Sequence, residues 1–253
     1  MKIRIIITSV ALVIPLCAHA EIASGTPQTN NGCGENCSWS LSDDGVLTVY
    51  GTGLMGGYEC IDTKHWLWEG GMSTWQTLAP WGEYSGQIKS IDIKEGIESI
   101  GYRAFYNVAA TNVHIPNSVK QISYGAFQYS NLQEVIIPDS VEKISGAAFY
   151  ETPISTIVIP ENTLLDPSDF IFTRLSTLYC PYNMLQTCER SVTEATKIEG
   201  YEKVGNAYFV NGKFYSSLSD MQKGHYQKKR IYTIEEAEKV SKKTGNIFRL
   251  RYK

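Results

Sequence analysis

Few side chains in this sequence have the types and spacing that acid–base or metal chemistry needs. Three histidines follow residue 20, at His65, His114 and His225. They are far apart, and no two have the spacing of a zinc-binding helix. Nucleophile-elbow, P-loop and dinucleotide-binding glycine patterns are also missing. Asp43 and Asp44 precede Gly45 in a predicted turn, which needs such residues. The sequence therefore predicts no catalytic residue, no metal site and no cofactor.

The cysteines form the second set of reactive side chains. Five follow residue 20, namely Cys33, Cys37, Cys60, Cys180 and Cys188. Disulfides are plausible in an exported protein, and two local pairs suggest themselves, Cys33–Cys37 and Cys180–Cys188. Connectivity does not follow from sequence, so Cys60 remains an alternative partner at the N-terminal end, and one thiol is left over. A zinc site at Cys33 and Cys37 is disfavoured because no matching pair follows.

The N-terminus indicates export. Lys2 and Arg4 precede an apolar run over residues 5–16, and Ala18-His19-Ala20 fits a cleavage site. The run is too short to span a bilayer, which needs about 20 residues. We therefore expect residues 1–20 to be a signal peptide and the remainder to be secreted, periplasmic or at the cell surface, without a transmembrane segment.

A 22-residue repeat must position whatever the protein binds. Apolar residues recur at this interval in four successive units, and each of the first three units ends in an Ala-Phe pair. The inward positions include Ile91, Val113, Val135 and Ile157, and the aromatic positions are Phe105, Phe127 and Phe149. Such self-similarity predicts a solenoid, in which stacked units share one core. A degenerate fifth unit is expected at residues 175–181.

Within each unit a short strand alternates inward and outward side chains and ends at a turn. Three strands are followed directly by proline, which has no N–H for the ladder, at Pro116, Pro138 and Pro160. The outward positions are Asp92, His114, Ile136 and Val158. Ile136 and Val158 are apolar, which favours a contact patch for a partner on this face.

The flanks resemble caps for the open ends of the stack. Residues 37–50 predict a β-hairpin, and a tryptophan-rich segment at 66–81 follows it. Near the C-terminus, Asn211-Gly212 predicts a second hairpin, and Thr233-Ile-Glu-Glu236 opens a helix. We expect an α+β protein: a signal peptide (1–20), an N-terminal hairpin and tryptophan-rich cap (21–86), a β-rich solenoid of about four to five repeats (87–181), and a small C-terminal α+β module (182–253).

The units that begin Ile115-Pro-Asn-Ser-Val and Ile137-Pro-Asp-Ser-Val, and end in Ala-Phe, resemble BspA-type leucine-rich repeats. The segment Trp39 to Gly53 and the pair Pro80-Trp81 also resemble the region that precedes such repeats. The resemblance implies a short leucine-rich-repeat solenoid in a secreted or surface protein of bacteria, linked to adhesion or protein binding. It implies neither catalytic residues nor one particular ligand.

Two functions follow as expectations. The first is a protein or glycoprotein partner on the outward face, without catalysis. The alternative is a glycan or anionic envelope polymer held by the N-terminal tryptophans and the basic tail, especially Lys228, Lys229 and Arg230. From Met221 onward ten basic residues stand against three glutamates. The tail lacks the interleaved aromatic residues of a nucleic-acid binder, so nucleic acid is disfavoured.

Overall fold

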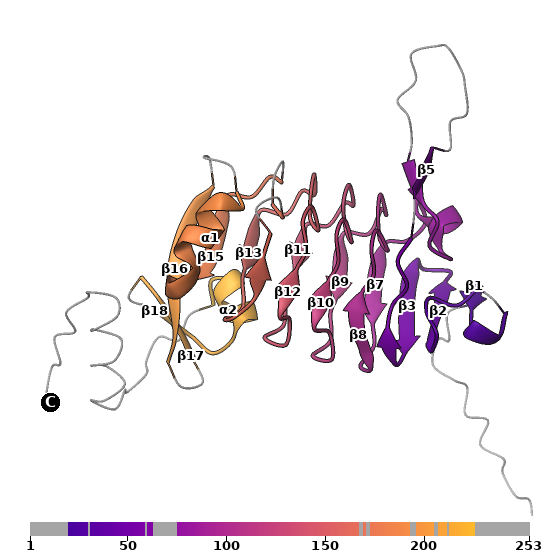
Figure 1. Ribbon diagram of the computed structural model, residues 1–253, viewed down its shortest axis with the longest axis horizontal. Helices are drawn as coiled ribbons and strands as arrows, with labels where there is room; N and C mark the ends of the chain where they lie inside the picture. The colour runs from indigo at the N-terminus through magenta and orange to yellow at the C-terminus, as the bar shows by residue number, and fades with distance from the viewer. Residues whose placement is uncertain are drawn as a thin grey trace, which may run out of the picture.

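Figure 1 shows the computed structural model as an elongated stack of short strands, with the N-terminal hairpin at one end and the C-terminal hairpin at the other. The structure describes residues 20–29, 31–58, 60–62, 75–166, 169–170, 173–192, 196–204, 207–211 and 213–225. The expected signal peptide up to residue 19 and the capping-box helix lie outside these residues, as do Trp66, Trp68 and residues 228–230. Within them, no helix is long and apolar enough to cross a membrane.

The front sheet begins with the predicted N-terminal hairpin and continues into the repeats. Its order is β1-β2-β3-β7-β9-β11, antiparallel over the first three strands and parallel afterwards. The register moves by one repeat from strand to strand, so Ile91 lies beside Val113 and Val113 beside Val135. The strands are β1 (Glu21–Gly25), β2 (Cys37–Ser42), β3 (Val46–Gly51), β7 (Ser90–Ile93), β9 (Asn112–His114) and β11 (Glu134–Val135).

The back sheet is built from the second apolar segment of each unit, and all its strands are parallel, in the order β14-β12-β10-β8-β4. Its strands are β4 (Gly53–Leu54), β8 (Ile97–Ile100), β10 (Gln121–Ile122), β12 (Lys143–Ile144) and β14 (Leu164–Leu165). The chain thus alternates between two sheets once per repeat, and the predicted short solenoid is confirmed. The remaining N-terminal elements are η1 (Pro27–Thr29), β5 (Cys60–Asp62), β6 (Trp75–Thr77) and η2 (Gly82–Tyr84).

Between the sheets, aromatic rings stack one per unit along the core. Phe105, Phe127, Phe149 and Phe170 are buried, with neighbouring ring centroids 5.3, 5.4 and 5.9 Å apart. Trp81 continues the column at 5.2 Å from Phe105, and its indole N–H donates to the Ala104 carbonyl at 2.9 Å. Trp81 is fully buried, which supports a capping role for this tryptophan. Truncating one of these phenylalanines to alanine costs roughly 3–5 kcal/mol in a typical core.

The third sheet shows that parallel stacking does not stop at Pro181. Its order is β13-β15-β16-β17-β18, and β16 pairs in parallel with β15, so it forms a sixth strand of the stack that the periodicity did not predict. The predicted hairpin at Asn211 is the antiparallel pair β17 and β18. The strands are β13 (Thr156–Val158), β15 (Thr177–Pro181), β16 (Lys197–Val204), β17 (Ala207–Val210) and β18 (Lys213–Tyr215).

Short helices and two disulfides complete the described fold. After Pro181 the chain forms η3 (Tyr182–Met184) and α1 (Leu185–Arg190), and α2 (Leu218–Gln222) follows β18. Phe170 N donates to Ser191 O just after α1, so this helix takes the place of a further unit at that edge. Cys33 is joined to Cys37 with a Cα separation of 4.8 Å, and Cys180 to Cys188 with one of 6.5 Å.

Candidate functional site

The outward positions of the front strands form a row that crosses the solenoid. Asp92 lies beside His114 in the register, and Ile136 occupies the next position of the row. On the third sheet the same position is taken by Val158, which pairs with Tyr179. His114 is exposed, whereas Asp92 and Ile136 are half-buried. The row therefore begins polar and becomes apolar toward the C-terminal end.

The prediction that Val158 is available to a partner is wrong. Its side chain points outward from the strand, but it is only 1% exposed because the chain's own C-terminal segment covers it. The covering cluster contains Tyr201, Tyr208, Val210, Tyr215, Leu218 and Met221. The apolar outward position thus marks an internal contact, since burial of an apolar side chain stabilises docking within the chain as readily as between chains.

Helix α2 sits over the place where the front sheet is interrupted. β11 and β13 belong to different sheets and are not joined by a ladder. The Gln222 side-chain amide donates to the Val135 carbonyl of β11 at 2.9 Å. The Lys223 ammonium lies 3.7 Å from the Glu134 carboxylate, a partly exposed pair that contributes little. The C-terminal segment therefore replaces part of the missing strand pairing.

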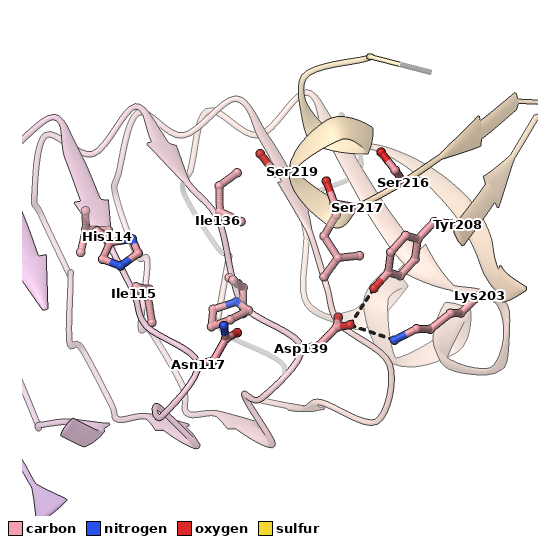
Figure 2. Close-up of a pocket in the computed structure, with 14 residues that line it drawn as sticks. His114, Ile115, Asn117, Ile136, Asp139, Lys203, Tyr208, Ser216, Ser217 and Ser219 are labelled. Atoms are coloured by element: carbon pink, nitrogen blue, oxygen red, sulfur yellow. Dashed lines mark hydrogen bonds and ion pairs between the residues drawn. The ribbon is translucent and has the colours of Figure 1, made fainter. Parts of the chain in front are cut away.

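A groove remains between this segment and the open part of the front sheet. Figure 2 shows His114 and Ile136 on its floor, with Ser217 and Ser219 on the facing wall. The groove encloses about 630 Å³. Ile115 also lines the floor, and Pro138 lies where the front strand turns away. One wall is made by the solenoid and the other by residues some 80 positions later in the chain.

One end of the groove is closed by a hydrogen-bonded cluster around Asp139, drawn with dashed lines in Figure 2. The Lys203 ammonium lies 2.8 Å from Asp139 Oδ2, and the Tyr208 hydroxyl donates to the same oxygen at 2.6 Å. Burial, followed by the hydrogen bond to Asp139, raises the pKa of Tyr208 to about 12. The hydrogen bond to Asp139 likewise raises the pKa of Lys203. Both donors therefore keep their protons at neutral pH, and the cluster anchors the hairpin to the repeat turn.

The serine wall is held by the cap of α2. Ser217 is the N-cap residue, and its hydroxyl accepts from the Asp220 N–H at 3.0 Å. Ser216 contacts the Asp220 carboxylate, and these contacts with the two serines lower the pKa of Asp220. Leu218 and Met221 are buried beneath the helix, so the serines are positioned by the same packing that covers Val158.

The groove has the chemistry of a recognition site. In the part of the chain that the structure describes, no hydrogen bond joins His114 to a groove serine. No group of three or more His, Cys, Asp or Glu side chains is placed to hold a metal ion within that part. What the groove offers is an apolar floor with hydroxyl and imidazole groups around it, which suits a peptide or a small polar segment.

The other predicted residues lie elsewhere. Asp92 is paired at 2.5 Å with Lys94, which directly follows β7, and does not line the groove. Residues 228–230, expected to bind anions, fall outside the described residues. Cys60 is in β5, and Cys33, Cys37, Cys180 and Cys188 are all occupied in disulfides. Of the four outward residues, the structure brings only His114 and Ile136 into the groove.

Sequence reasoning missed the second wall entirely. Tyr208 was part of a predicted hairpin, and Asp139 part of a predicted turn, but no sequence signal pointed to a contact between them. An apolar residue at an outward position, such as Val158, indicates that another surface buries it. That surface could belong to a partner or to the same chain, and the sequence alone did not decide between them.

Comparison with known proteins places the repeats in a family. A family model described as BspA type leucine rich repeat region matches residues 83–199 in six copies. The matched range ends at residue 199, within β16. No protein with a curated function matches the chain significantly.

Several solved structures are partly similar. A leucine-rich repeat protein from Eubacterium ventriosum is 22% identical to this chain. The match covers 75% of this chain and 49% of the Eubacterium protein, with a TM-score of 0.46. The T. pallidum leucine-rich repeat protein is 16% identical to this chain. The match covers 57% of this chain and 69% of the T. pallidum protein, with a TM-score of 0.36. A leucine rich cell surface protein from Faecalibacterium prausnitzii is 17% identical to this chain. The match covers 72% of this chain and 59% of that protein, with a TM-score of 0.23. This chain spans about half the length of the first of these proteins.

Proposed function

We propose, on the premise that the repeat region of this chain belongs to the BspA-type leucine-rich repeats, that the protein is an exported, surface-associated module that binds a protein or glycoprotein without catalysis. Repeat proteins of this kind present extended surfaces to partners. The leader-like residues 1–20 support export, and the family supports an interaction role. The protein partner contacts the open half of the front face and enters the groove.

The observation that carries the proposal is the groove itself. It combines a half-buried Ile136 and an exposed His114 with hydroxyl groups from a second wall. Interfaces of this kind have an apolar centre and a polar rim. The adjacent position, Val158, packs against apolar side chains of the same chain, an observation that supports apolar docking along this row.

The alternative, a glycan or envelope polymer held by the N-terminal tryptophans and the basic tail, has less support. Trp81 is buried in the core column and offers no surface for stacking. The residues on which this alternative now depends, Trp66, Trp68 and the basic cluster at 228–230, lie outside the described part of the chain.

A site-specific cross-linking experiment tests the proposal. A photo-reactive phenylalanine analogue replaces His114 in the groove, and a matched control replaces Gln121, an exposed strand residue of the back sheet. After illumination with intact cells, we expect a discrete protein adduct from position 114 and none from position 121. In the captured complex, Ile136→Asp is expected to weaken affinity by about tenfold or more. Identical adducts from both positions, or an unchanged affinity of the Ile136 variant, contradict the proposal.

A further inference from the structure

Five tyrosines from three successive units gather on one edge of the solenoid, where the back strands end and the chain returns to the front strands. We call this surface the tyrosine edge: Tyr102, Tyr106, Tyr124, Tyr129 and Tyr150. Tyr124 is 44% exposed and Tyr129 37% exposed. Because the groove of Figure 2 lies toward the other end of the front strands, near the proline turns, the two surfaces are distinct.

The rings of the tyrosine edge are ordered by the repeat. Tyr102 and Tyr124 stack with centroids 5.8 Å apart and planes inclined by 21°. Tyr129 makes edge contacts with Tyr106 at 5.3 Å and with Tyr150 at 5.6 Å. These contacts fix the rings against one another, Tyr106 is buried, and Tyr124 and Tyr129 are the exposed rings of the edge.

Tyr129 stands in a conformation that its side chain disfavours. Its φ is 61°, in the left-handed region, where bulky residues are rarely found. The same position in the unit before is Asn107, with φ 54°, and asparagine tolerates this region. The turn alone therefore does not call for a tyrosine here. The unit after has Glu151 at this position with φ 54°, so the left-handed turn recurs from repeat to repeat.

Two unpaired polar atoms lie inside the tyrosine edge. The Arg103 guanidinium carbon is 5.0 Å from the Tyr102 ring centroid and 5.7 Å from that of Tyr106. Arg103 Nε and Gln128 Oε1 are buried, and neither has a hydrogen-bond partner among the described residues. Both side chains flank Gly125, where an added Cβ would meet Gln128 Oε1 at 3.0 Å and Arg103 Cγ at 3.2 Å. Such atoms are costly and are seldom left without a partner. An arginine N–H donates and a glutamine carbonyl oxygen accepts, so a hydroxyl group, which does both, matches the chemistry of the pair.

A polar hollow continues the tyrosine edge toward the C-terminal end. It encloses about 530 Å³ and is lined by Asn131, Glu151, Thr152, Pro153 and Arg174. Glu151 directly follows Tyr150, and Asn131 follows Tyr129 by two positions. An amide, a carboxylate and a guanidinium together supply several donors and acceptors, which match neighbouring hydroxyls on one molecule.

We propose that the tyrosine edge and this hollow bind a neutral polysaccharide chain. A sugar ring has a C–H face that packs on an aromatic ring and a rim of hydroxyls that needs donors and acceptors. Tyr124 and Tyr129 expose part of their rings for such packing, and the hollow supplies the donors and acceptors. Arg174 and Glu151 both line the hollow, so the surface has charges of both signs and no strong field for a polyanion.

Two substitutions test this, one of which is taken from a neighbouring repeat. Tyr129→Asn copies Asn107 and relieves the strained φ, and Tyr124→Ser removes an exposed ring. The matched control is Tyr50→Ser on β3, where the tyrosine is 37% exposed on the N-terminal hairpin. The protein from Glu21 to the C-terminus is titrated with hexasaccharides of β-linked glucose, mannose and N-acetylglucosamine, and with polygalacturonate as the charged comparison. Binding is followed by calorimetry and by saturation-transfer NMR.

We expect at least one neutral hexasaccharide to bind, the double variant to lose about tenfold or more in affinity, and the Tyr50 variant to match the wild type. Thermal unfolding of each variant checks that the fold persists. Binding of polygalacturonate alone, no binding of any neutral glycan, or equal affinity of the double variant overturns the proposal. If the double substitution instead abolishes capture of a protein while glycans never bind, the tyrosine edge is a protein interface and the proposal is also wrong.

Discussion

The two halves of the solenoid have the same repeat but differ in the contacts of their outward side chains and in one inward residue. In the turns built on β7, β9 and β11 the front row is open, and the column before the core phenylalanines is alanine, at Ala104, Ala126 and Ala148. In the turns on β13 and β15 the front row is covered by the C-terminal segment, and Asp169 occupies the alanine column. The repeat therefore specifies the backbone equally in both halves, whereas single residues decide which half presents a surface.

The largest expected effect concerns Asp169, which is fully buried where the open half has alanine. Burial raises the pKa of this carboxyl to about 8, against about 3.9 in the unfolded chain. The folded state then binds more protons than the unfolded state between these values, so the free energy of unfolding is greatest below about pH 4 and falls as pH rises through about 8. The slope reaches at most about 1.4 kcal/mol per pH unit. Asp169→Asn should flatten the profile.

Urea unfolding at successive pH values measures this slope. Glu98→Gln, which changes an exposed carboxylate in the open half, is the control and should keep the wild-type profile. A wild-type stability that rises between pH 5 and 8, or an Asp169→Asn variant with an unchanged slope, means that the buried carboxyl is not the source of the difference between the halves.

The second prediction compares neighbouring outward positions of the row. Val158→Asp places a carboxylate under the C-terminal segment and should lower the free energy of unfolding by about 3 kcal/mol. Ile136→Asp, at the half-buried position in the groove, should cost about 1 kcal/mol or less. Denaturant titrations give both values. Equal costs at the two positions imply that the C-terminal segment does not cover Val158 in solution.

A smaller effect concerns the cluster that joins the halves. Tyr208→Phe removes the hydrogen bond to Asp139 and should cost about 1 kcal/mol. A double-mutant cycle with Asp139→Asn is expected to give a coupling of similar size. The side chains of Lys203 and Asp139 are 34% and 45% exposed, so their ion pair adds less.

The smallest effect is expected for Asp92→Asn, which breaks the partly exposed ion pair with Lys94. It should change the free energy of unfolding by less than about 0.5 kcal/mol in a denaturant titration, and a larger loss contradicts the comparison.

Much of the fold was predictable from particular residues. The recurrence of Ile91, Val113 and Val135 gave the strand register, and the Ala-Phe pairs gave the aromatic column of the core. β16 was missed because Ile198 follows Leu178 by 20 positions in the register, so the sixth strand does not keep the 22-residue interval. β16 is also followed directly by the β17–β18 hairpin, so local sequence patterns assign it to the C-terminal module and not to the stack.

The candidate surfaces were harder to predict because they combine residues that the period does not relate. Ile136 and His114 were placed on the correct face, but the serine wall of the groove comes from the segment after β18. The tyrosine edge is visible only when Tyr102 and Tyr124 are seen in adjacent turns, together with the unpaired atoms of Arg103 and Gln128. Neither set has a sequence motif.

The sequence by itself determined the solenoid, its register, the hairpins at both ends and the faces of the strands, because each follows from contacts between residues one repeat apart or closer. Only the tertiary structure decided that Val158 is covered and Ile136 is not, and that Asp139 holds Lys203 and Tyr208. Docking of the C-terminal segment depends on shape and burial between distant parts of the chain. Any apolar surface that buries an apolar side chain stabilises it in the same way. The residue type at position 158 therefore does not tell whether a partner or the same chain covers it.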